Sequence, residues 1–147
     1  MGGHTKNPTY KEVCSGKTGH AEVIDLEYDA HEISFDELLL VFFKTHNPTT
    51  LNRQGNDVGT QYRSVIFYAD AAQESSARKI IAEFEASGAW DGKIVTEVSP
   101  APAFYRAEPE HDQYFARNPY AGYCQAVIAP KVAKMRKKFA ERLRKAA

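Results

Sequence analysis

Residues 53–64 read Arg-Gln-Gly-Asn-Asp-Val-Gly-Thr-Gln-Tyr-Arg-Ser and separate a helix-like segment from a strand-like one. They belong to a stretch, residues 46–61, that has neither a helical nor an alternating apolar period. Connections this long are uncommon inside compact domains and are often functional, because a rigid scaffold holds polar groups there without burying them. We therefore expect a functional site formed by this stretch and by a second glycine-containing stretch, residues 16–22.

Apolar patterns on both sides of this stretch predict the strands. Ile24, Leu26 and Tyr28 alternate with acidic residues, which is the period-two pattern of a strand, so a first strand is expected at residues 21–28. A continuous apolar run predicts a central strand at residues 64–68, and a shorter pattern predicts a third strand at residues 93–98.

Capping signals predict the helices. Ser34 and Glu37 match a capping box, and the helix that they begin is expected to end before Asn47-Pro48, because the residue before a proline avoids the helical region. Asp70 and Gln73 match the cap of a second helix. Further helices are expected at residues 107–117 and at about 131–145. These elements predict an α+β fold, a two-layer α/β sandwich whose helices cover a mixed sheet.

The composition excludes several classes of protein. The chain has 147 residues, which suits a single domain spanning residues 1–147, and its 19 Lys+Arg balance 19 Asp+Glu, so nothing favours nucleic acid or a membrane as partner. It contains no spanning apolar run and no signal-peptide pattern, so we expect a cytoplasmic protein. Cys14 and Cys124 are too few for a disulfide scaffold and lack zinc-ligand spacing, so we expect no metal and no bound cofactor.

Glu22 is the first candidate for chemistry. In the expected strand it shares the core face with Ile24, where desolvation favours the neutral, proton-donating form of a carboxyl group. A solvated Glu22 at the end of the strand fits the pattern equally well. Asp57 is either a turn residue that bonds its own backbone or a group with a chemical role. Tyr10 and Tyr62 are either core aromatic residues or phenolic hydrogen-bond donors.

The two cysteines are open to two interpretations. An isolated cysteine is more often a small buried apolar residue than a reactive group. Cys124 follows Gly122-Tyr123, however, and such flanking leaves a thiol in the exposed and mobile setting of a redox cysteine. Cys14 lies in the other loop, near Tyr10, and the sequence leaves a disulfide between Cys14 and Cys124 undecided.

A set of long, ordered motifs runs from residue 2 to about residue 125. The motifs are Gly2-Gly3, Asn7-Pro8-Thr9-Tyr10, Glu12-Val13-Cys14-Ser15-Gly16, Thr18-Gly19-His20-Ala21-Glu22, Arg53-Gln54-Gly55-Asn56-Asp57, Gly59-Thr60-Gln61-Tyr62-Arg63-Ser64, Phe104-Tyr105, Ala107-Glu108, His111 and Gly122-Tyr123-Cys124. In these motifs the chain resembles the A-type methionine sulfoxide reductases, the peptide-methionine (S)-S-oxide reductases.

The resemblance implies a thiol chemistry and a set of roles. In that family a cysteine thiolate attacks the sulfoxide sulfur and becomes a sulfenic acid as methionine is released, and a second cysteine then forms a disulfide that thioredoxin reduces. By resemblance Glu22 is the acid at the sulfoxide oxygen, Tyr10, Asp57 and Tyr62 help to bind that oxygen, and Cys124 is the resolving cysteine. The implied function is the repair of oxidised methionine, free or in proteins, with thioredoxin as external reductant.

The sequence departs from the family in one motif. The family's nucleophilic cysteine lies in a Gly-Cys-Phe-Trp motif at the start of a helix that follows the first strand, and this motif is absent from the sequence. We therefore expect a ferredoxin-like plait without its first strand and helix, little activity in this form, and poor solubility or dimerisation through the exposed sheet edge. The alternatives are a non-catalytic module that binds oxidised methionine and an enzyme that uses Cys14 as its thiol.

Overall fold

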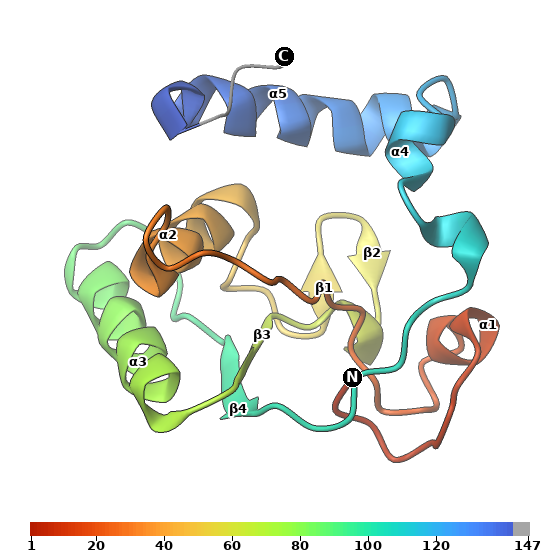
Figure 1. Ribbon diagram of the computed structural model, residues 1–147, viewed down its shortest axis with the longest axis horizontal. Helices are drawn as coiled ribbons and strands as arrows, with labels where there is room; N and C mark the ends of the chain where they lie inside the picture. The colour runs from red at the N-terminus through yellow and green to blue at the C-terminus, as the bar shows by residue number, and fades with distance from the viewer. Residues whose placement is uncertain (143–147) are drawn as a thin grey trace. The chain divides into compact units, whose positions relative to one another are not determined.

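The computed structural model describes residues 1–142 and separates into two compact units, residues 1–106 and residues 107–147. The first unit contains α1 (Tyr10–Cys14), α2 (Phe35–Thr45), β1 (Arg53–Gln54), β2 (Asp57–Val58), the 3-10 turn η1 (Thr60–Tyr62), β3 (Val65–Tyr68), α3 (Ala71–Ala86) and β4 (Glu97–Pro100) (Figure 1). The described part of the second unit contains η2 (Pro109–His111), α4 (Tyr114–Arg117), the π-helical turn η3 (Cys124–Ile128), α5 (Ala129–Lys138) and η4 (Ala140–Arg142).

The core of the first unit lies between its two long helices and a small sheet. Helix α2 packs against α3, and α3 packs against β3 and β4 (Figure 1). The buried core residues are Leu39, Phe43, Ile66, Ala77, Ile80 and Ile94. This arrangement confirms the α+β class, with helices on a sheet, that the alternation of helical and strand patterns predicted.

The capping signals are confirmed at both long helices. Ser34 Oγ accepts a hydrogen bond from the Glu37 amide at 3.2 Å, and a Glu37 carboxylate oxygen accepts one from the Ser34 amide at 3.0 Å. Asp70 caps α3 by accepting from the Gln73 amide at 2.8 Å. Helix α2 ends at Thr45, ahead of Asn47-Pro48.

The central strand is confirmed, and the third strand is displaced along the chain. β3 pairs with β4 in parallel, from Val65 opposite Glu97 to Tyr68 opposite Pro100. The strand begins at Glu97 instead of residue 93 because the preceding residues bond elsewhere: the Val95 amide donates to the Pro48 carbonyl at 2.8 Å. A salt bridge of 3.1 Å joins Arg63 Nε to the Glu97 carboxylate beside the first pair of the ladder.

The prediction of a first strand at residues 21–28 is wrong for the described structure. These residues form no β-ladder with any described residue. Among their backbone amides, only those of Ala21 and Glu22 donate to backbone carbonyls of other described segments, at Met1 and Gln61 respectively. Ile24 is 81% exposed and Leu26 is 57% exposed, so the alternating face does not lie in the core. An alternating sequence becomes a strand only where a neighbouring strand accepts its backbone hydrogen bonds.

This exposed segment leads to a prediction about self-association. Because an extended segment with exposed apolar residues can pair with another chain, we expect the protein to form dimers or larger species at micromolar concentration. The double change Ile24→Ser and Leu26→Ser should shift it toward the monomer in sedimentation velocity, whereas Leu51→Ser, at a residue 70% exposed elsewhere in the unit, should not. A wild-type chain that stays monomeric over the same range would contradict the prediction.

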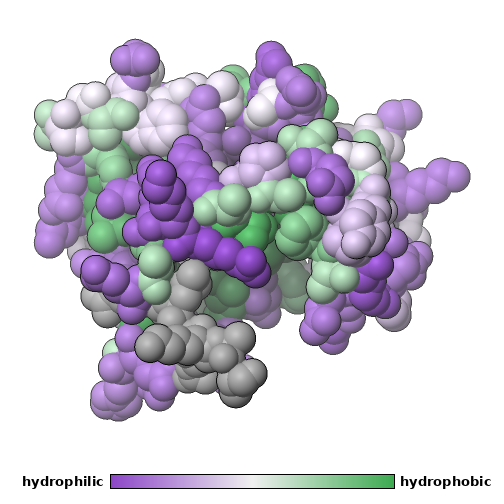
Figure 2. Space-filling view, turned by 90° about the horizontal axis from the view of Figure 1, so that it is seen from above, coloured by the Kyte–Doolittle hydropathy of each residue, from purple (hydrophilic) through white to green (hydrophobic). Residues whose placement is uncertain are grey.

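The second unit departs from the expected helix boundaries. The expected helix at residues 107–117 is interrupted at Gln113, whose φ of 52° is left-handed, so that only Tyr114–Arg117 is α-helical. Helix α5 runs from Ala129 to Lys138, and the end of the expected helix beyond residue 142 lies outside the described residues. Figure 2 shows hydrophilic residues over much of the face that it draws, with apolar residues exposed among them. Among residues 1–142, the helices are all too short or too polar to cross a bilayer.

Candidate active site

Helix α1 was missed by the sequence analysis and carries two of the candidate groups. Thr9 Oγ1 accepts from the Glu12 amide at 3.3 Å, and the Glu12 carboxylate accepts from the Thr9 amide at 2.8 Å, so the helix begins with a full capping box. These hydrogen bonds from Thr9 lower the pKa of Glu12, which keeps the cap ionised at neutral pH. Tyr10 and Cys14 are four residues apart and therefore share one face of α1. The spacing Thr9-x-x-Glu12 was the signal that could have revealed this helix.

Glu22 is held by the loop of residues 18–22. The buried His20 accepts from the Gly3 amide through Nδ1 at 3.0 Å, so its Nε2 carries the proton and donates to the Thr5 carbonyl at 2.7 Å. The His20 ring also meets Tyr105 edge-on, with ring centroids 5.5 Å apart. These contacts fix the loop, and the Glu22 amide donates to the Gln61 carbonyl at 2.9 Å.

A β-hairpin and the turn after it position Asp57 and Tyr62. β1 and β2 pair antiparallel, with Gln54 opposite Asp57, and Gly55 supplies the positive φ of 61° that the first position of the two-residue turn requires. Tyr62 ends the 3-10 turn η1 that follows the hairpin. The glycine-containing stretch that the sequence singled out therefore forms a short, ordered structure.

These segments bring a thiol, a carboxylate and two phenols together. The Cys14 thiol donates to Glu22 Oε1 at an Sγ–Oε1 distance of 3.9 Å. Partial burial, then a hydrogen bond with Cys14, then the charge of Glu22 raise the pKa of Tyr10 well above its usual value. Burial, then the charges of Glu22, Cys14 and Asp57 raise the pKa of Tyr62. We call Tyr10, Cys14, Glu22 and Tyr62 the thiol–phenol cluster.

One expectation about Glu22 requires correction. The sequence analysis placed its carboxyl group on a buried face, where desolvation favours the neutral form, but Glu22 is exposed in the structure. The solvated alternative therefore describes its setting. Its carboxylate accepts a hydrogen bond from the Cys14 thiol.

Gln61 was not predicted as a site residue, although it precedes Tyr62 in the same motif. Gln61 is 4% exposed, and its Nε2 donates to the Cys14 carbonyl at 3.1 Å. Its own carbonyl accepts from the Glu22 amide at 2.9 Å. One buried residue therefore ties the Cys14 segment to the Glu22 segment. Within residues 1–142, its Oε1 atom is buried without a hydrogen-bond partner.

The remaining candidates have different settings. Cys124 is fully buried in the second unit, at the start of the π-helical turn η3, and it is a free thiol like the exposed Cys14. His46 is bonded on both ring nitrogens, to the Phe42 carbonyl at 2.6 Å and to Ser64 Oγ at 2.8 Å. The described residues contain no group of three or more His, Cys, Asp or Glu side chains arranged to hold a metal ion.

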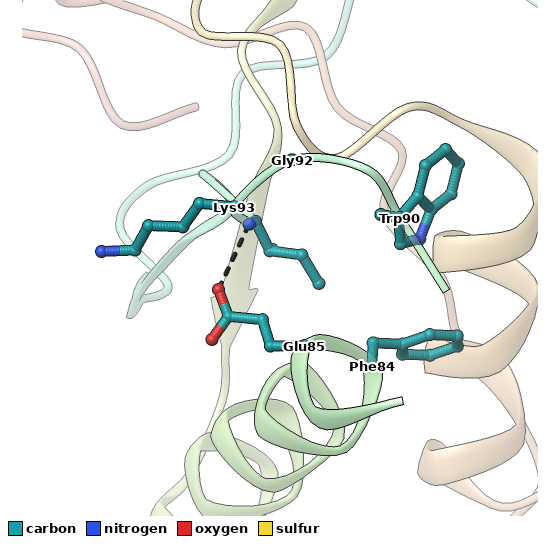
Figure 3. Close-up of a pocket in the computed structure, with 6 residues that line it drawn as sticks. Phe84, Glu85, Trp90, Gly92 and Lys93 are labelled. Atoms are coloured by element: carbon teal, nitrogen blue, oxygen red, sulfur yellow. Dashed lines mark hydrogen bonds between the residues drawn. The ribbon is translucent and has the colours of Figure 1, made fainter. Parts of the chain in front are cut away.

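A hollow of about 360 Å³ lies at the end of α3 and is separate from the candidate residues. Its lining consists of Phe84, Glu85, Trp90, Gly92, Lys93 and Ile94 (Figure 3). The Glu85 carboxylate in it accepts from the Ile94 amide at 3.2 Å, which closes the turn after the helix. None of the candidate residues named above lines this hollow.

The fold and the cluster together define a small α+β protein with an exposed thiol beside a carboxylate and two phenols. These side chains are typical of a thiol-dependent oxidoreductase. The family model described as "Peptide methionine sulfoxide reductase" matches residues 1–143. The chain belongs to the peptide methionine sulfoxide reductase family. Membership places it among oxidoreductases that reduce methionine sulfoxide to methionine by thiol chemistry, without a prosthetic cofactor.

Curated relatives match almost all of the chain. The peptide methionine sulfoxide reductase MsrA of Granulibacter bethesdensis is 56% identical over 143 residues, which are 97% of this chain and 77% of the relative. The enzyme of the same name from Chromobacterium violaceum is 52% identical over 142 residues, 97% of this chain and 81% of the relative.

Solved structures of the family share the fold. Methionine sulfoxide reductase A of Corynebacterium diphtheriae matches with a TM-score of 0.76 and 43% identity, over 86% of this chain and 64% of the other. Mxr1 from Saccharomyces cerevisiae in reduced form matches with a TM-score of 0.74 and 41% identity, over 79% of this chain and 63% of the other. The chain thus spans a little under two thirds of the length of these two solved chains.

Proposed function

We propose that this chain reduces methionine-(S)-sulfoxide, free or in peptides and proteins, at the thiol–phenol cluster. The observation that carries the proposal is the position of Glu22, whose carboxylate accepts from the Cys14 thiol and, after burial, is one of the causes that raise the pKa of Tyr10 and Tyr62. A sulfoxide oxygen is a strong hydrogen-bond acceptor, and it takes up negative charge as the sulfur–oxygen bond breaks. Hydrogen-bond donors at that oxygen stabilise the negative charge that develops on it and therefore speed the reaction.

The phenols suit the role of donors to this oxygen. Because burial and the nearby anionic groups raise the pKa values of Tyr10 and Tyr62, both phenols stay protonated at neutral pH. They can therefore donate to the sulfoxide oxygen, while Asp57 adds negative charge that keeps Tyr62 protonated. Glu22 then delivers a proton to the oxygen as the bond breaks.

The test is turnover with the phenols removed. A hydrogen bond to a charged group is worth about 1.5–3 kcal/mol, so we expect Tyr10→Phe and Tyr62→Phe each to lower kcat/KM by roughly 10- to 100-fold with a methionine-(S)-sulfoxide peptide and dithiothreitol. Tyr120→Phe, at a tyrosine that is 91% exposed, is the control and should leave the rate unchanged. Full activity in both cluster variants would refute the proposed role of the phenols.

The same variants test how the ionisation of the two phenols depends on pH. A raised phenol pKa means that the donating form is fully present below the ordinary value near 10 and is lost only as the pH rises through the raised value. In an ultraviolet titration, each Tyr→Phe change at the cluster should therefore remove a tyrosine that ionises above the ordinary tyrosine pKa. Removal of an early-ionising tyrosine would contradict this expectation.

Further parts of the proposal rest on the family. We infer that Cys124 is the resolving cysteine, that thioredoxin regenerates the dithiol, and that residues 1–147 form one reductase domain, since the family model extends across both units. The sheet and helices of the first unit are proposed to be part of a ferredoxin-like plait with a mixed sheet, supported by the likeness to longer solved chains. The cytoplasmic location and the lack of nucleic-acid or membrane partners stay predictions from the sequence.

A further inference from the structure

We propose that His20 is a positioning residue for Glu22: its neutral imidazole ring fixes the loop that leads to Glu22 and so sets where that carboxylate lies in the thiol–phenol cluster. The inference rests on the proposed function, and it concerns a residue that acts through Glu22 without touching the substrate. His20 is 2% exposed and lies two residues before the exposed Glu22. A buried side chain directly before an exposed acid is a point from which that acid can be held in place.

The His20 ring is bonded through both nitrogens to one distant segment, residues 1–5. Nδ1 accepts from the Gly3 amide at 3.0 Å, and Nε2 donates to the Thr5 carbonyl at 2.7 Å. A proton on Nδ1 in place of Nε2 would face the Gly3 N–H and would leave the Thr5 carbonyl without its donor. The Tyr105 ring packs edge-on against the imidazole, at an interplanar angle of 81°. The neutral ring with its proton on Nε2 therefore holds one orientation and connects two segments.

The backbones of these two segments lie unusually close together. The His4 amide donates to the Thr18 carbonyl at 3.0 Å, and the Ala21 amide donates to the Met1 carbonyl at 2.9 Å. A Cβ at Gly3 would lie 2.3 Å from the Thr18 carbonyl oxygen, which is closer than two such atoms can approach. Glycine at this position therefore permits the contact that places the imidazole between its partners.

Glu22 depends on this contact because little else holds it. Its amide donates to the Gln61 carbonyl at 2.9 Å. In the described part of the chain, the amides of residues 23–28 donate to no backbone carbonyl of another segment. The position of the carboxylate beside the Cys14 thiol is therefore set by the bond to Gln61 and by the loop that His20 fixes.

The first experiment compares turnover of a methionine-(S)-sulfoxide peptide, with dithiothreitol, by the full chain and by His20→Ala. A misplacement of about 1 Å can cost roughly 100-fold in rate, so we expect kcat to fall about 10- to 100-fold. KM should change by less than about threefold, because the phenols proposed to bind the sulfoxide oxygen, Tyr10 and Tyr62, lie on other segments.

A double-mutant cycle tests whether His20 acts through Glu22. In a Glu22→Gln background the proposed acid is already lost, so adding His20→Ala should lower the residual rate by less than about twofold. A residue that served only the general stability of the unit would lower the rate by the same factor in both backgrounds.

The matched control is His46→Ala. His46 is also bonded through both ring nitrogens, to the Phe42 carbonyl at 2.6 Å and to Ser64 Oγ at 2.8 Å, but it does not belong to the loop before Glu22. Its loss should lower the melting temperature and leave the kcat of the folded chain unchanged. Circular dichroism sets the assay temperature below the melting transition of every variant.

Hydrogen exchange reports the position of the loop without any turnover. His20→Ala should speed the exchange of the Ala21 and Glu22 amides by at least about tenfold, because their bonds to carbonyls of other segments open when the loop is released. The amides of α3 should keep their wild-type protection, since a local release does not reach them. A loss of stability throughout the unit would instead raise exchange in both places.

A second variant leaves the imidazole in place. Gly3→Ala introduces a Cβ that forces the same two segments apart, so it should reproduce the effects of His20→Ala on exchange and on kcat. Gly92→Ala is the control for a glycine change, because a Cβ there would meet Thr49 at an ordinary contact distance of 3.4 Å. It should match the wild type in both measurements.

The outcomes separate the inference from the proposed function. A wild-type kcat in His20→Ala, or losses that multiply fully in the double variant, overturns the inference and leaves the proposed function standing. Unchanged exchange of the Glu22 amide in His20→Ala also overturns it. If the wild-type chain shows no turnover, the proposed function fails for this chain, and the exchange measurements alone decide whether His20 holds Glu22.

Discussion

Glu22→Gln is expected to lower kcat/KM for a methionine-(S)-sulfoxide peptide by roughly 10²- to 10⁴-fold, the range that a positioned acid–base group supplies. Glutamine keeps the size of the side chain but cannot give a proton to the sulfoxide oxygen. The variant therefore loses the proposed proton donor at the point where the carboxylate accepts from the Cys14 thiol and acts on Tyr10 and Tyr62.

The control for this change lies on the same segment. Glu27 is also exposed, and Glu27→Gln removes the same charge at a residue that is not part of the cluster, so its rate should match the wild type. Both variants should melt like the wild type, because neither carboxylate is in the core. A Glu22→Gln chain within threefold of the wild-type rate would remove Glu22 from the mechanism.

Phe43→Ala is expected to lower the free energy of unfolding by about 3–5 kcal/mol, which is most of the stability of many domains of this size. Phe43 is completely buried, and its ring lies 5.2 Å from that of Phe42 and 5.3 Å from that of Phe84 between ring centroids. Removing the ring leaves a cavity between α2 and α3 that neither helix can close without moving. Urea unfolding followed by circular dichroism measures the change.

The matched substitution for Phe43→Ala is Leu51→Ala, at a residue that is 70% exposed. Exposed positions of this kind change stability by about 0.5 kcal/mol or less, so the two variants should differ severalfold in their loss of stability. Equal losses would mean that the packing of α2 on α3 does not dominate the stability of the first unit. The activity of Phe43→Ala at low temperature should remain, because the ring is not part of the cluster.

Local patterns predicted those parts of the fold that depend on neighbours in sequence. The capping box at Ser34, the N-cap at Asp70, the apolar run of β3 and the end of α2 before Pro48 are confirmed, because each depends on interactions within a few residues. The same kind of signal at Thr9 and Glu12 was present and was overlooked, so α1 was predictable as well.

Local patterns could not show whether residues 21–28 form a strand. Its alternation is real, but a strand requires a partner that accepts its hydrogen bonds, and partners are a property of the tertiary structure. The displacement of β4 has the same cause, since the Val95 amide bonds to the Pro48 carbonyl instead of joining the ladder.

By itself the sequence determined the class of elements, the family and the candidates Glu22, Tyr10, Asp57, Tyr62 and Cys124, because these are carried by local patterns and motifs. Only the tertiary structure decided which thiol lies beside the carboxylate, that Glu22 is exposed, and that Gln61 joins the two segments. The physical reason is distance along the chain: the hydrogen bond between Gln61 and Cys14 joins residues 47 positions apart, and local sequence patterns do not report contacts of that range.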